Sequence, residues 1–489
     1  MRTHPHLYEI SAWPWLERLS RQENRRVTLG DVPASAWDAI EKSGMDCVYL
    51  MGVWQRSAAG RLMGRTDPSL IAEYDRGLPG WEMRDVPGSP YCIQAYEPDD
   101  RMGGWKGLDK ARKDLADRGL SLILDFVPNH TGFDHEWVRT NPEFYVQGTL
   151  DNYRAEPILY HPIEDEDGSH VRFVACGRDP FFAPWRDVAQ LNYFNPGTRD
   201  AMIGVLQTIA KHCDGVRCDM AMLVLNDVFA QTWGGRVDLL HAAPAEEFWP
   251  QATRRAKMTY LAEVYWDREY QLQQQGFDYT YDKRLLDRLE HGHMDEARGH
   301  LHADPAYSAR LARFLENHDE ARSAPVFGHR IRAAAALTFT LPGLRFFFDG
   351  QFEGVPLRLP VQLGRWPEDP VRPEIRDLYT RLLKVIDKPL FHDGEWSLLS
   401  VRGAGDSSNG NLLACAWKKG KDVAVVVANV SHHDAQGLVE IGELPKGETF
   451  DLKDQLSDQS YRWTRADLGN GLYVRLTSGD AHLFLLKAV

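Results

Sequence analysis

The sequence predicts an α/β protein built on a (β/α)8 TIM barrel, with an inserted subdomain after the third strand and a C-terminal all-β sandwich. Apolar strand-like runs alternate with helix-length segments as far as about Lys388, which is typical of a parallel barrel. Residues 131–190 interrupt this alternation, and short strands separated by turns follow Lys388. We therefore expect the barrel at 1–130 and 191–388, the insertion at 131–190 and the sandwich at 389–489.

Eight runs are candidates for the barrel strands, and continuous apolar strands of this kind are buried on both faces of a parallel sheet. They lie at 7–13, 47–54, 121–127, 215–221, 260–266, 278–285, 313–319 and 344–350. Helices are expected at about 33–43 and 105–119, whereas residues 60–100 are rich in Gly and Pro and predict a long connection. An open doubly wound sheet is the alternative, but the first strand lacks a Gly-rich phosphate loop.

Composition excludes several classes of partner. A net charge of −13 and a pI near 5.8 argue against binding to nucleic acid or to an anionic membrane. The six cysteines are scattered without a CxxC pair, which predicts reduced, buried thiols and a cytoplasmic protein. The N-terminal residues lack the apolar core of a secretory signal. The apolar run 333–348 contains Pro342, Gly343 and Arg345, so we expect a helix, a turn and a buried strand rather than a membrane span.

Four of the strand-like runs end in carboxylates, histidines or an arginine. They are LSLILDFVPNH (120–130), DGVRCDMA (214–221), TYLAEVYW (259–266) and ARFLENHDE (312–320). A single charged residue at a strand end usually meets solvent. Four such endings in one barrel instead predict side chains that converge at its C-terminal mouth, where barrel enzymes place their active sites. The pattern therefore favours an enzyme that works with carboxylates.

These four stretches resemble, in order and content, the four signature regions of the α-amylase superfamily, glycoside hydrolase family 13. GSPYCIQAYEP (88–98), DVAQLNYFNP (187–196) and FFFDGQFEG (346–354) are similar to further segments of that family. Each motif alone is weak, but the ordered set is specific and spans residues 7 to about 388.

The resemblance implies a role for eight residues. Asp219 matches the nucleophile, Glu263 the general acid/base and Asp319 the carboxylate that stabilises the transition state. The matched substrate-binding positions are Arg217 beside the nucleophile, His130 and His318 for sugar hydroxyls, Tyr96 for stacking on the sugar ring, and Asp125 as support for the arginine.

The chemistry of a retaining glycosidase requires the same residue types. One carboxylate must attack the anomeric carbon and one acid must protonate the leaving oxygen, with the two carboxyl groups about 5–5.5 Å apart. Arg217 stands two positions before Asp219, on the same face of a strand, and a cation there favours the ionised nucleophile. Apolar residues surround Glu263 and are expected to raise its pKa toward that of a working acid.

Two departures from the family pattern shape our expectations. Calcium-dependent members carry a Lys-His pair after the nucleophile, where this chain has Met222 and Leu223. Asn129 matches a calcium ligand, and Asp134, Glu136 and Asp151 offer oxygens, but without the spacing of a calcium loop. We therefore expect no metal and no cofactor.

The second departure lies in YCIQAY, where exo-acting α-glucosidases of the family have acids that close the pocket. Here Cys92 and Ala95 stand instead, which predicts a more open distal wall unless the insertion or the 350–366 loop closes it. Arg358, Arg365 and Asp369 are the candidates from that side.

The sequence thus predicts a retaining α-glycoside hydrolase that acts on α-linked glucans or oligosaccharides by double displacement. A transglycosylase or phosphorylase acting on a small α-glucoside is the alternative among enzymes. A non-catalytic carbohydrate-binding or scaffold relative is disfavoured because Asp219, Glu263 and Asp319 are all present.

Overall fold

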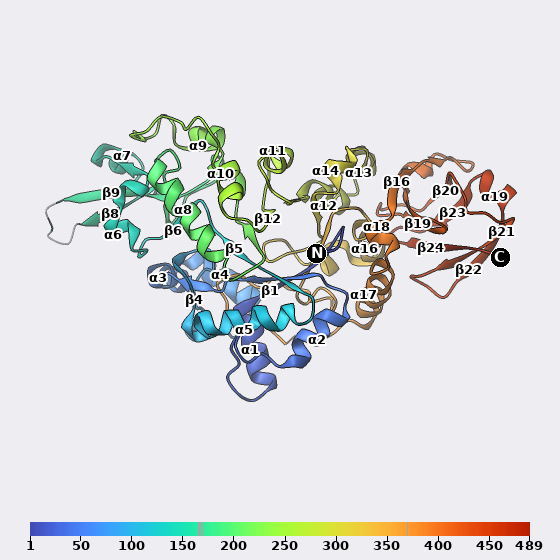
Figure 1. Cartoon of the computed structure of the whole chain (residues 1–489), viewed down its shortest axis with the longest axis horizontal. Helices are drawn as coiled ribbons and strands as arrows, with labels where there is room; N and C mark the ends of the chain where they lie inside the picture. Colours follow the sequence, from blue (N-terminus) through green and yellow to red (C-terminus); the bar gives the residue numbers. More distant parts are fainter. Residues whose placement is uncertain (165–167, 169, 369) are drawn as a thin grey trace.

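Eight parallel strands close into a barrel at the centre of the molecule, which confirms the predicted TIM-barrel fold (Figure 1). The structure is a computed structural model that describes residues 1–164, 168, 170–368 and 370–489. Consecutive barrel strands are neighbours around the barrel. In chain order they are β1 (His6–Ser11), β2 (Cys47–Met51), β5 (Ser121–Phe126), β11 (Gly215–Cys218), β12 (Thr259–Ala262), β13 (Tyr279–Tyr281), β14 (Leu311–Arg313) and β15 (Leu344–Phe348).

Helices connect the barrel strands and cover their outer faces. They include α1 (Ala12–Gln22), α2 (Ala34–Lys42), α5 (Gly104–Ala116), α8 (Pro196–Ile209), α10 (Phe248–Arg255), α12 (Lys283–Glu290), α13 (Met294–Leu301), α16 (Ile331–Thr338) and α17 (Pro373–Ile386). The start of α8 shows why a helix begins where it does. The Asn195 side chain accepts from the Gly197 amide, and Pro196 takes the first helical position, where no amide donor is needed.

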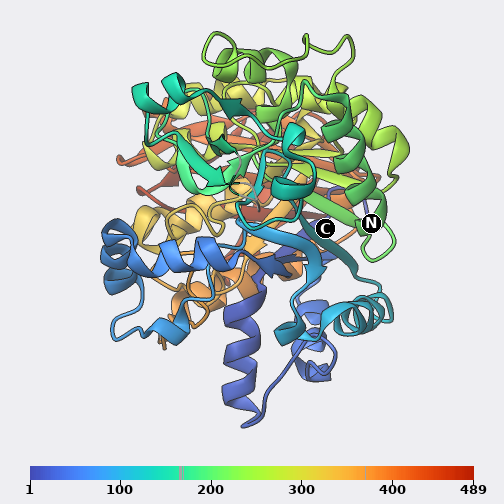
Figure 2. The same cartoon turned by 90° about the vertical axis from the view of Figure 1, so that its left-hand side faces the viewer.

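The insertion forms a separate sheet beside the barrel mouth. Its strands are β6 (His130–Gly132), β7 (Gln147–Gly148), β8 (Tyr160–Glu164), β9 (Val171–Gly177) and β10 (Trp185–Gln190). β10 pairs with β6, which begins four residues after the end of β5, so the sheet is anchored close to the C-terminal end of this barrel strand. Figure 2 shows this part of the chain in front of the barrel, with the C-terminal strands behind it.

The C-terminal region is a sandwich of two antiparallel sheets. One sheet contains β16 (Glu395–Leu399), β18 (Leu413–Lys419), β19 (Asp422–Ala428), β24 (Ala481–Ala488), β21 (Thr449–Asp454) and β22 (Ser460–Thr464). The other contains β17 (Val401–Arg402), β20 (Ala435–Val439) and β23 (Leu472–Leu476). Alternate side chains of both sheets, such as Val425 and Val474, meet in a core separate from that of the barrel.

The structure corrects the sequence prediction at several strand ends and in one connection. The strands expected at 215–221, 260–266 and 313–319 end at Cys218, Ala262 and Arg313, so the polar residues that follow lie in loops. The strand expected at 278–285 ends at Tyr281, because Asp282 caps the start of α12 by accepting from the Leu285 amide. The expected connection at 60–100 contains two helices, α3 (Ala58–Thr66) and α4 (Pro68–Gly77), and a short strand, β4 (Ile93–Pro98). The run at 333–348 is a helix, a turn and a buried strand, as predicted.

None of the helices in the described part of the chain is both long and apolar enough to span a bilayer. All six cysteines are free and buried. The free, buried thiols agree with the prediction made from the spacing of the cysteines.

Candidate active site

Arg217, fully buried on β11, lies at the centre of the carboxylate cluster that the sequence predicted. Its Nη1 donates to Asp219 Oδ1 at 2.7 Å. Its Nη2 lies 2.8 Å from Glu263 Oε2 and 3.8 Å from Asp319 Oδ2, close enough for ion pairs although not aligned for hydrogen bonds. Asp219 and Glu263 directly follow β11 and β12, so the cluster forms at the C-terminal mouth of the barrel. One guanidinium therefore gathers all three predicted catalytic carboxylates.

Glu263 is held from both sides and is almost completely buried. The Met220 amide donates to its Oε2 at 2.7 Å, and the Tyr265 hydroxyl donates to its Oε1 at 2.9 Å. Burial raises the pKa of Glu263 to about 7; Arg217 opposes this shift, and the neighbouring Asp219 and Asp319 add to it. Near neutral pH this carboxyl group can therefore carry a proton, as a general acid requires.

Asp319 and Asp219 differ from Glu263 in their electrostatics. Burial acts to raise the pKa of Asp319, but His318 and Arg217 outweigh it and lower the pKa to about 2. His318 Nε2 lies 2.9 Å from Asp319 Oδ2. Burial raises the pKa of Asp219, and Arg217 opposes this shift through its direct hydrogen bond. The geometry thus separates Glu263, whose pKa is raised to about 7, from Asp319, whose pKa His318 and Arg217 lower to about 2.

The three carboxylates open into a pocket of about 360 Å³, which we call the catalytic pocket. His130 lines it, as the sequence predicted. Burial lowers the pKa of His130 to about 4, so its ring is neutral at physiological pH and can both donate and accept hydrogen bonds. The remaining lining residues are Ser89, Tyr91, Trp185, Asp187, Val188, Met220, Tyr265 and Gln362.

The tyrosine at this pocket is Tyr91, and the prediction that placed Tyr96 there is wrong. The Tyr96 hydroxyl donates to the Val127 carbonyl and accepts from the Val127 amide, and its ring packs on Trp54 and Phe126. Tyr91 instead stacks on His318, with ring centroids 5.4 Å apart, and its ring faces the Arg217 guanidinium. The sequence offered two tyrosines five positions apart, and the motif was matched to the wrong one.

Asp125 lies beneath the cluster rather than in contact with the pocket. It is fully buried on β5 and is level with Arg217 on the neighbouring strand. Its carboxylate accepts from the Tyr49 hydroxyl and, at 2.6 Å, from the Gly52 amide. Its place suits the predicted support of Arg217, but its burial is against direct contact with substrate.

Cys92 does not form the distal wall that the sequence assigned to it. Its thiol is buried against Gly60 of α3 and donates to the Asp187 carbonyl at 3.0 Å. The residues that line the catalytic pocket include Asp187 from the insertion and Gln362 from the 350–366 loop.

The candidates Arg358 and Arg365 are not among the described residues that line the catalytic pocket. Arg358 donates to the Asp319 carbonyl at 2.9 Å, and Arg365 pairs with Asp85. Asp369 lies outside the described residues.

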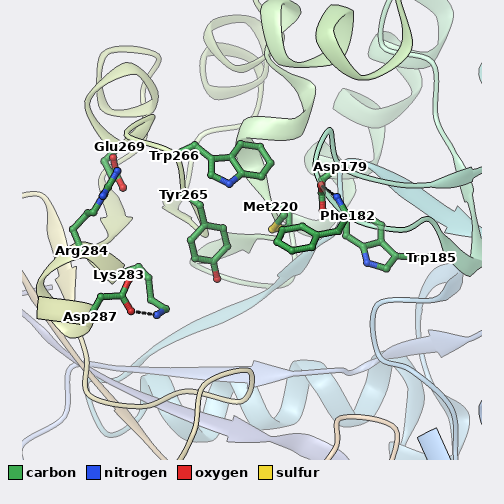
Figure 3. Close-up of a pocket in the computed structure, with 10 residues that line it drawn as sticks. All are labelled: Asp179, Phe182, Trp185, Met220, Tyr265, Trp266, Glu269, Lys283, Arg284 and Asp287. Atoms are coloured by element: carbon green, nitrogen blue, oxygen red, sulfur yellow. Dashed lines mark hydrogen bonds and ion pairs between the residues drawn. The ribbon is translucent and has the colours of Figure 1, made fainter. Parts of the chain in front are cut away.

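A second pocket, of about 570 Å³, adjoins the first through Trp185, Met220 and Tyr265, and we call it the aromatic pocket (Figure 3). Figure 3 shows Phe182 and Trp266 gathered around it from separate segments. Phe182 is 68% exposed, in a loop without periodic pattern that offered no sequence signal.

The backbone beside the catalytic carboxylates is strained. Met220, Trp266 and Asp267 have left-handed φ values of 41°, 63° and 60°, which are uncommon for residues other than glycine. Met220 directly follows Asp219, and this conformation accompanies the bond from its amide to Glu263. Strained residues of this kind concentrate at functional sites, where the surrounding structure holds them in place.

The residues at the family's calcium position do not fit a cation. The Gln190 side-chain amide donates to both the backbone carbonyl and the Oδ1 of Asn129, and the Asn129 amide donates back to Gln190 Oε1. We call this pair the amide clasp. In this pair, neutral N–H groups already donate to the oxygens that a calcium ion would need as ligands. Met222 and Leu223 are buried apolar residues, and Asp134 caps α3.

With the fold and site in view, comparison with known proteins identifies the class. The family model described as "Alpha amylase, catalytic domain" matches residues 40–357. The chain belongs to this family, as the signature regions predicted.

Individual relatives are distant. "Alpha-amylase 3" of Dictyoglomus thermophilum is 24% identical over 307 residues, covering 59% of this chain and 58% of that protein. "Alpha-1,4-glucan:maltose-1-phosphate maltosyltransferase 2" of Streptomyces coelicolor is 25% identical over 482 residues, covering 92% of this chain and 63% of that protein. The chain thus spans less than two thirds of the length of either relative.

Among solved structures, the noncanonic maltogenic alpha-amylase AmyB from Thermotoga neapolitana has a TM-score of 0.70 at 19% identity. The match covers 100% of this chain and 99% of that one. At this identity the likeness demonstrates the shared fold.

Proposed function

We propose that this protein is a retaining α-glycosidase of the α-amylase type, which acts on α-linked glucans or oligosaccharides by double displacement. The observation that carries the proposal is the arrangement of Asp219, Glu263 and Asp319 around the single buried guanidinium of Arg217. A non-catalytic scaffold would have no need to gather three carboxylates, two of them buried, around one cation, because burying such charges opposes folding.

Each carboxylate has a step in the proposed mechanism. Glu263, protonated near neutral pH, gives its proton to the leaving oxygen while Asp219 attacks the anomeric carbon to form a glycosyl-enzyme ester. Glu263, now ionised, then takes a proton from the incoming hydroxyl, which releases the sugar with net retention. Asp319 is the most exposed of the three, with 42% of its side chain accessible, and suits contact with ring hydroxyls.

The aromatic pocket supports a neutral sugar or water as the acceptor. Lys283 and Arg284 are the cationic side chains among the described residues that line the two pockets, and both are paired with carboxylates. Lys283 contacts Asp287, and Arg284 lies 2.5 Å from Asp267. Inorganic phosphate would find no unpaired cation there, whereas aromatic side chains pack well on sugar rings. This argues against a phosphorylase and leaves transglycosylation to a sugar hydroxyl as the alternative.

The proposal also covers cofactor and compartment. The amide clasp supports catalysis without calcium, and the described chemistry needs no other group. Six free thiols are compatible with a reducing cytoplasm.

Product analysis tests the proposal. The protein is incubated with maltose, longer malto-oligosaccharides, sucrose and trehalose, with and without phosphate. Proton NMR follows the anomer released first, and mass spectrometry follows product size. We expect the α-anomer first and no sugar phosphate, and Asp219→Asn should abolish both hydrolysis and transfer. Release of the β-anomer first, or products that require phosphate, would contradict the mechanism.

A further inference from the structure

The mechanism above leaves one buried carboxylate at the barrel mouth without a role. Glu9 lies in the middle of β1, with its side chain inside the barrel and no exposed surface. One carboxylate oxygen, Oε1, contacts His318 Nδ1, and the other, Oε2, has no hydrogen-bond partner among the described residues. Burying a carboxylate with half of its acceptors unused costs stability. Such a residue calls for an explanation beyond packing.

Both ring nitrogens of His318 face carboxylate oxygens. Nδ1 contacts Glu9, and Nε2 lies 2.9 Å from Asp319 Oδ2. A neutral imidazole has only one N–H, so it would point a lone pair at one of the two carboxylates. An imidazolium donates to both.

Charges on the surrounding elements agree with this assignment. Burial acts to lower the pKa of His318, but Asp319 and Glu9 outweigh it and raise the pKa well above its ordinary value. Arg217 from β11 and Arg358 from the 350–366 loop are cations nearby. Arg217 is already engaged by Asp219 and Glu263, and Arg358 donates to the Asp319 carbonyl.

Tyr91 fixes the orientation of the imidazole ring. Its hydroxyl lies 2.6 Å from His318 Nε2, and the two rings stack with an interplanar angle of 25°. Arg217 packs on the Tyr91 ring at 5.3 Å from its centroid. The ring of His318 is thus clamped between β1 and the segment before β4, and its second N–H can point only toward Asp319 and the Tyr91 hydroxyl.

The main effect of this arrangement is on the orientation of the Asp319 carboxylate. Its side chain is 42% exposed, and its described partners are His318 and the more distant Arg217. Without a donor on His318, the carboxylate would be free to turn toward solvent. The charge on Glu9 therefore acts on Asp319 through the imidazole.

We propose that Glu9 is a positioning residue that keeps His318 as an imidazolium, whose Nε2–H then holds Asp319 toward the reacting sugar ring. The assignment rests on the proposed function only in its last step, since the charge state of His318 can be measured without substrate. Glu9 itself does not touch the substrate.

The test combines kinetics with nitrogen NMR on protein labelled with ¹⁵N-histidine. In the wild-type protein we expect both His318 nitrogens to be protonated at pH 7, with the signals assigned by their loss in His318→Gln. Glu9→Gln preserves shape and one acceptor but removes the charge, so His318 should become neutral. kcat should fall about 10- to 100-fold, the loss typical when an outer partner of a ligand-holding imidazole is removed, with a smaller change in KM.

Two variants control for folding. Asp454→Asn removes another fully buried carboxylate, which accepts from the Leu456 and Leu483 amides in the C-terminal sandwich, and it should leave the His318 signals and kcat unchanged. Glu9→Asp retains the charge and should retain the imidazolium and most of the activity, which keeps the test decisive if Glu9→Gln does not fold.

A neutral His318 in the wild-type protein, or an imidazolium that persists in folded Glu9→Gln, overturns the proposal. If the imidazolium is present and depends on Glu9 while no α-glucoside is cleaved, the proposed function fails but the role of Glu9 in charging His318 stands.

Discussion

Each end of the barrel has a cluster of ionisable side chains, but the groups that these side chains contact differ between the two clusters. The mouth cluster consists of Arg217, Asp219, Glu263, His318 and Asp319, whose charged groups contact one another. The base cluster consists of His4, His6, Arg345 and His392 at the other end of β1 and β15. Its members contact mainly the backbone.

The base cluster keeps its histidines neutral. Burial, assisted by Arg345, lowers the pKa of His4 to about 3 and that of His6 well below its ordinary value. Arg345 donates to the Phe391 carbonyl at 2.7 Å and lies 3.1 Å from His6 Nε2, and His392 contacts the Thr3 carbonyl through Nδ1.

His6, His392 and Asp387 could group around a metal ion, but Arg345 and Arg2 place positive charge beside them. Polar groups satisfied by backbone serve stability, whereas charges aimed at one another in a pocket serve chemistry.

The largest expected effect comes from a substitution that disrupts the mouth cluster alone. Glu263→Gln cannot supply a proton to the leaving oxygen, a contribution that is typically about 10²–10⁴-fold, so kcat on oligosaccharides should fall by that order. Aryl glycosides with good leaving groups should lose less in the first step. Thermal unfolding should change little. Wild-type turnover of an oligosaccharide by this variant would remove Glu263 from the mechanism.

The complementary change breaks the base cluster. Arg345→Met should reduce the free energy of unfolding by about 1–3 kcal/mol, the cost of leaving a buried acceptor unpaired, measured by urea denaturation. The kcat per folded molecule and its pH dependence should remain those of the wild type. A shifted pH profile would show that the two ends are coupled.

The contributions of the two clusters to stability are expected to change in opposite directions as the pH rises. Because burial raises the pKa of Glu263 to about 7, kcat/KM should fall as pH rises through 7 and the acid is lost. Glu263 also stabilises the fold fully below its unfolded pKa, and this contribution is lost as pH rises toward 7. The histidines of the base cluster have lowered pKa values, so they stabilise the fold above pH 6.5 and lose this contribution as pH falls toward 3.

Urea titrations between pH 5 and 8 measure these two contributions. Glu263→Gln should flatten the fall in stability between about pH 4.5 and 7, where the Glu263 contribution is lost. An unchanged slope in that range would mean that Glu263 is not the group responsible.

The smallest expected effect concerns metal. Because the amide clasp fills the calcium position with neutral groups, EDTA should leave both kcat and the unfolding temperature unchanged. Gln190→Asp is the informative companion, since it restores a carboxylate beside Asn129 and should make the unfolding temperature respond to added calcium. Inactivation of the wild-type protein by EDTA, reversed by calcium, would show that a site exists elsewhere.

The catalytic carboxylates were predictable because each follows a barrel strand, where charge interrupts an apolar run. Glu9 could not be predicted, because it lies inside a strand and the pattern of charged residues at strand ends does not include it. The sequence could not show which of Tyr91 and Tyr96 points into the pocket. β4 pairs irregularly with β3 (Trp54–Arg56), so the alternation of side chains does not predict which face of the sheet each residue occupies. The helices α3 and α4 were hidden by glycines at positions 60, 64 and 77, which disrupt the helical pattern.

The left-handed backbone at Met220 and Trp266 has a consequence for reading the sequences of related proteins. Such conformations cost of order 1–3 kcal/mol each for residues other than glycine, so substitution by Gly or Asn there should be tolerated and even stabilising. A bulky side chain that persists at either position despite that cost indicates selection for what it does beside Glu263. Glycine at these positions would indicate a related protein in which that selection no longer acts. The residues at these two positions therefore indicate whether a relative has kept its activity, in addition to the carboxylates.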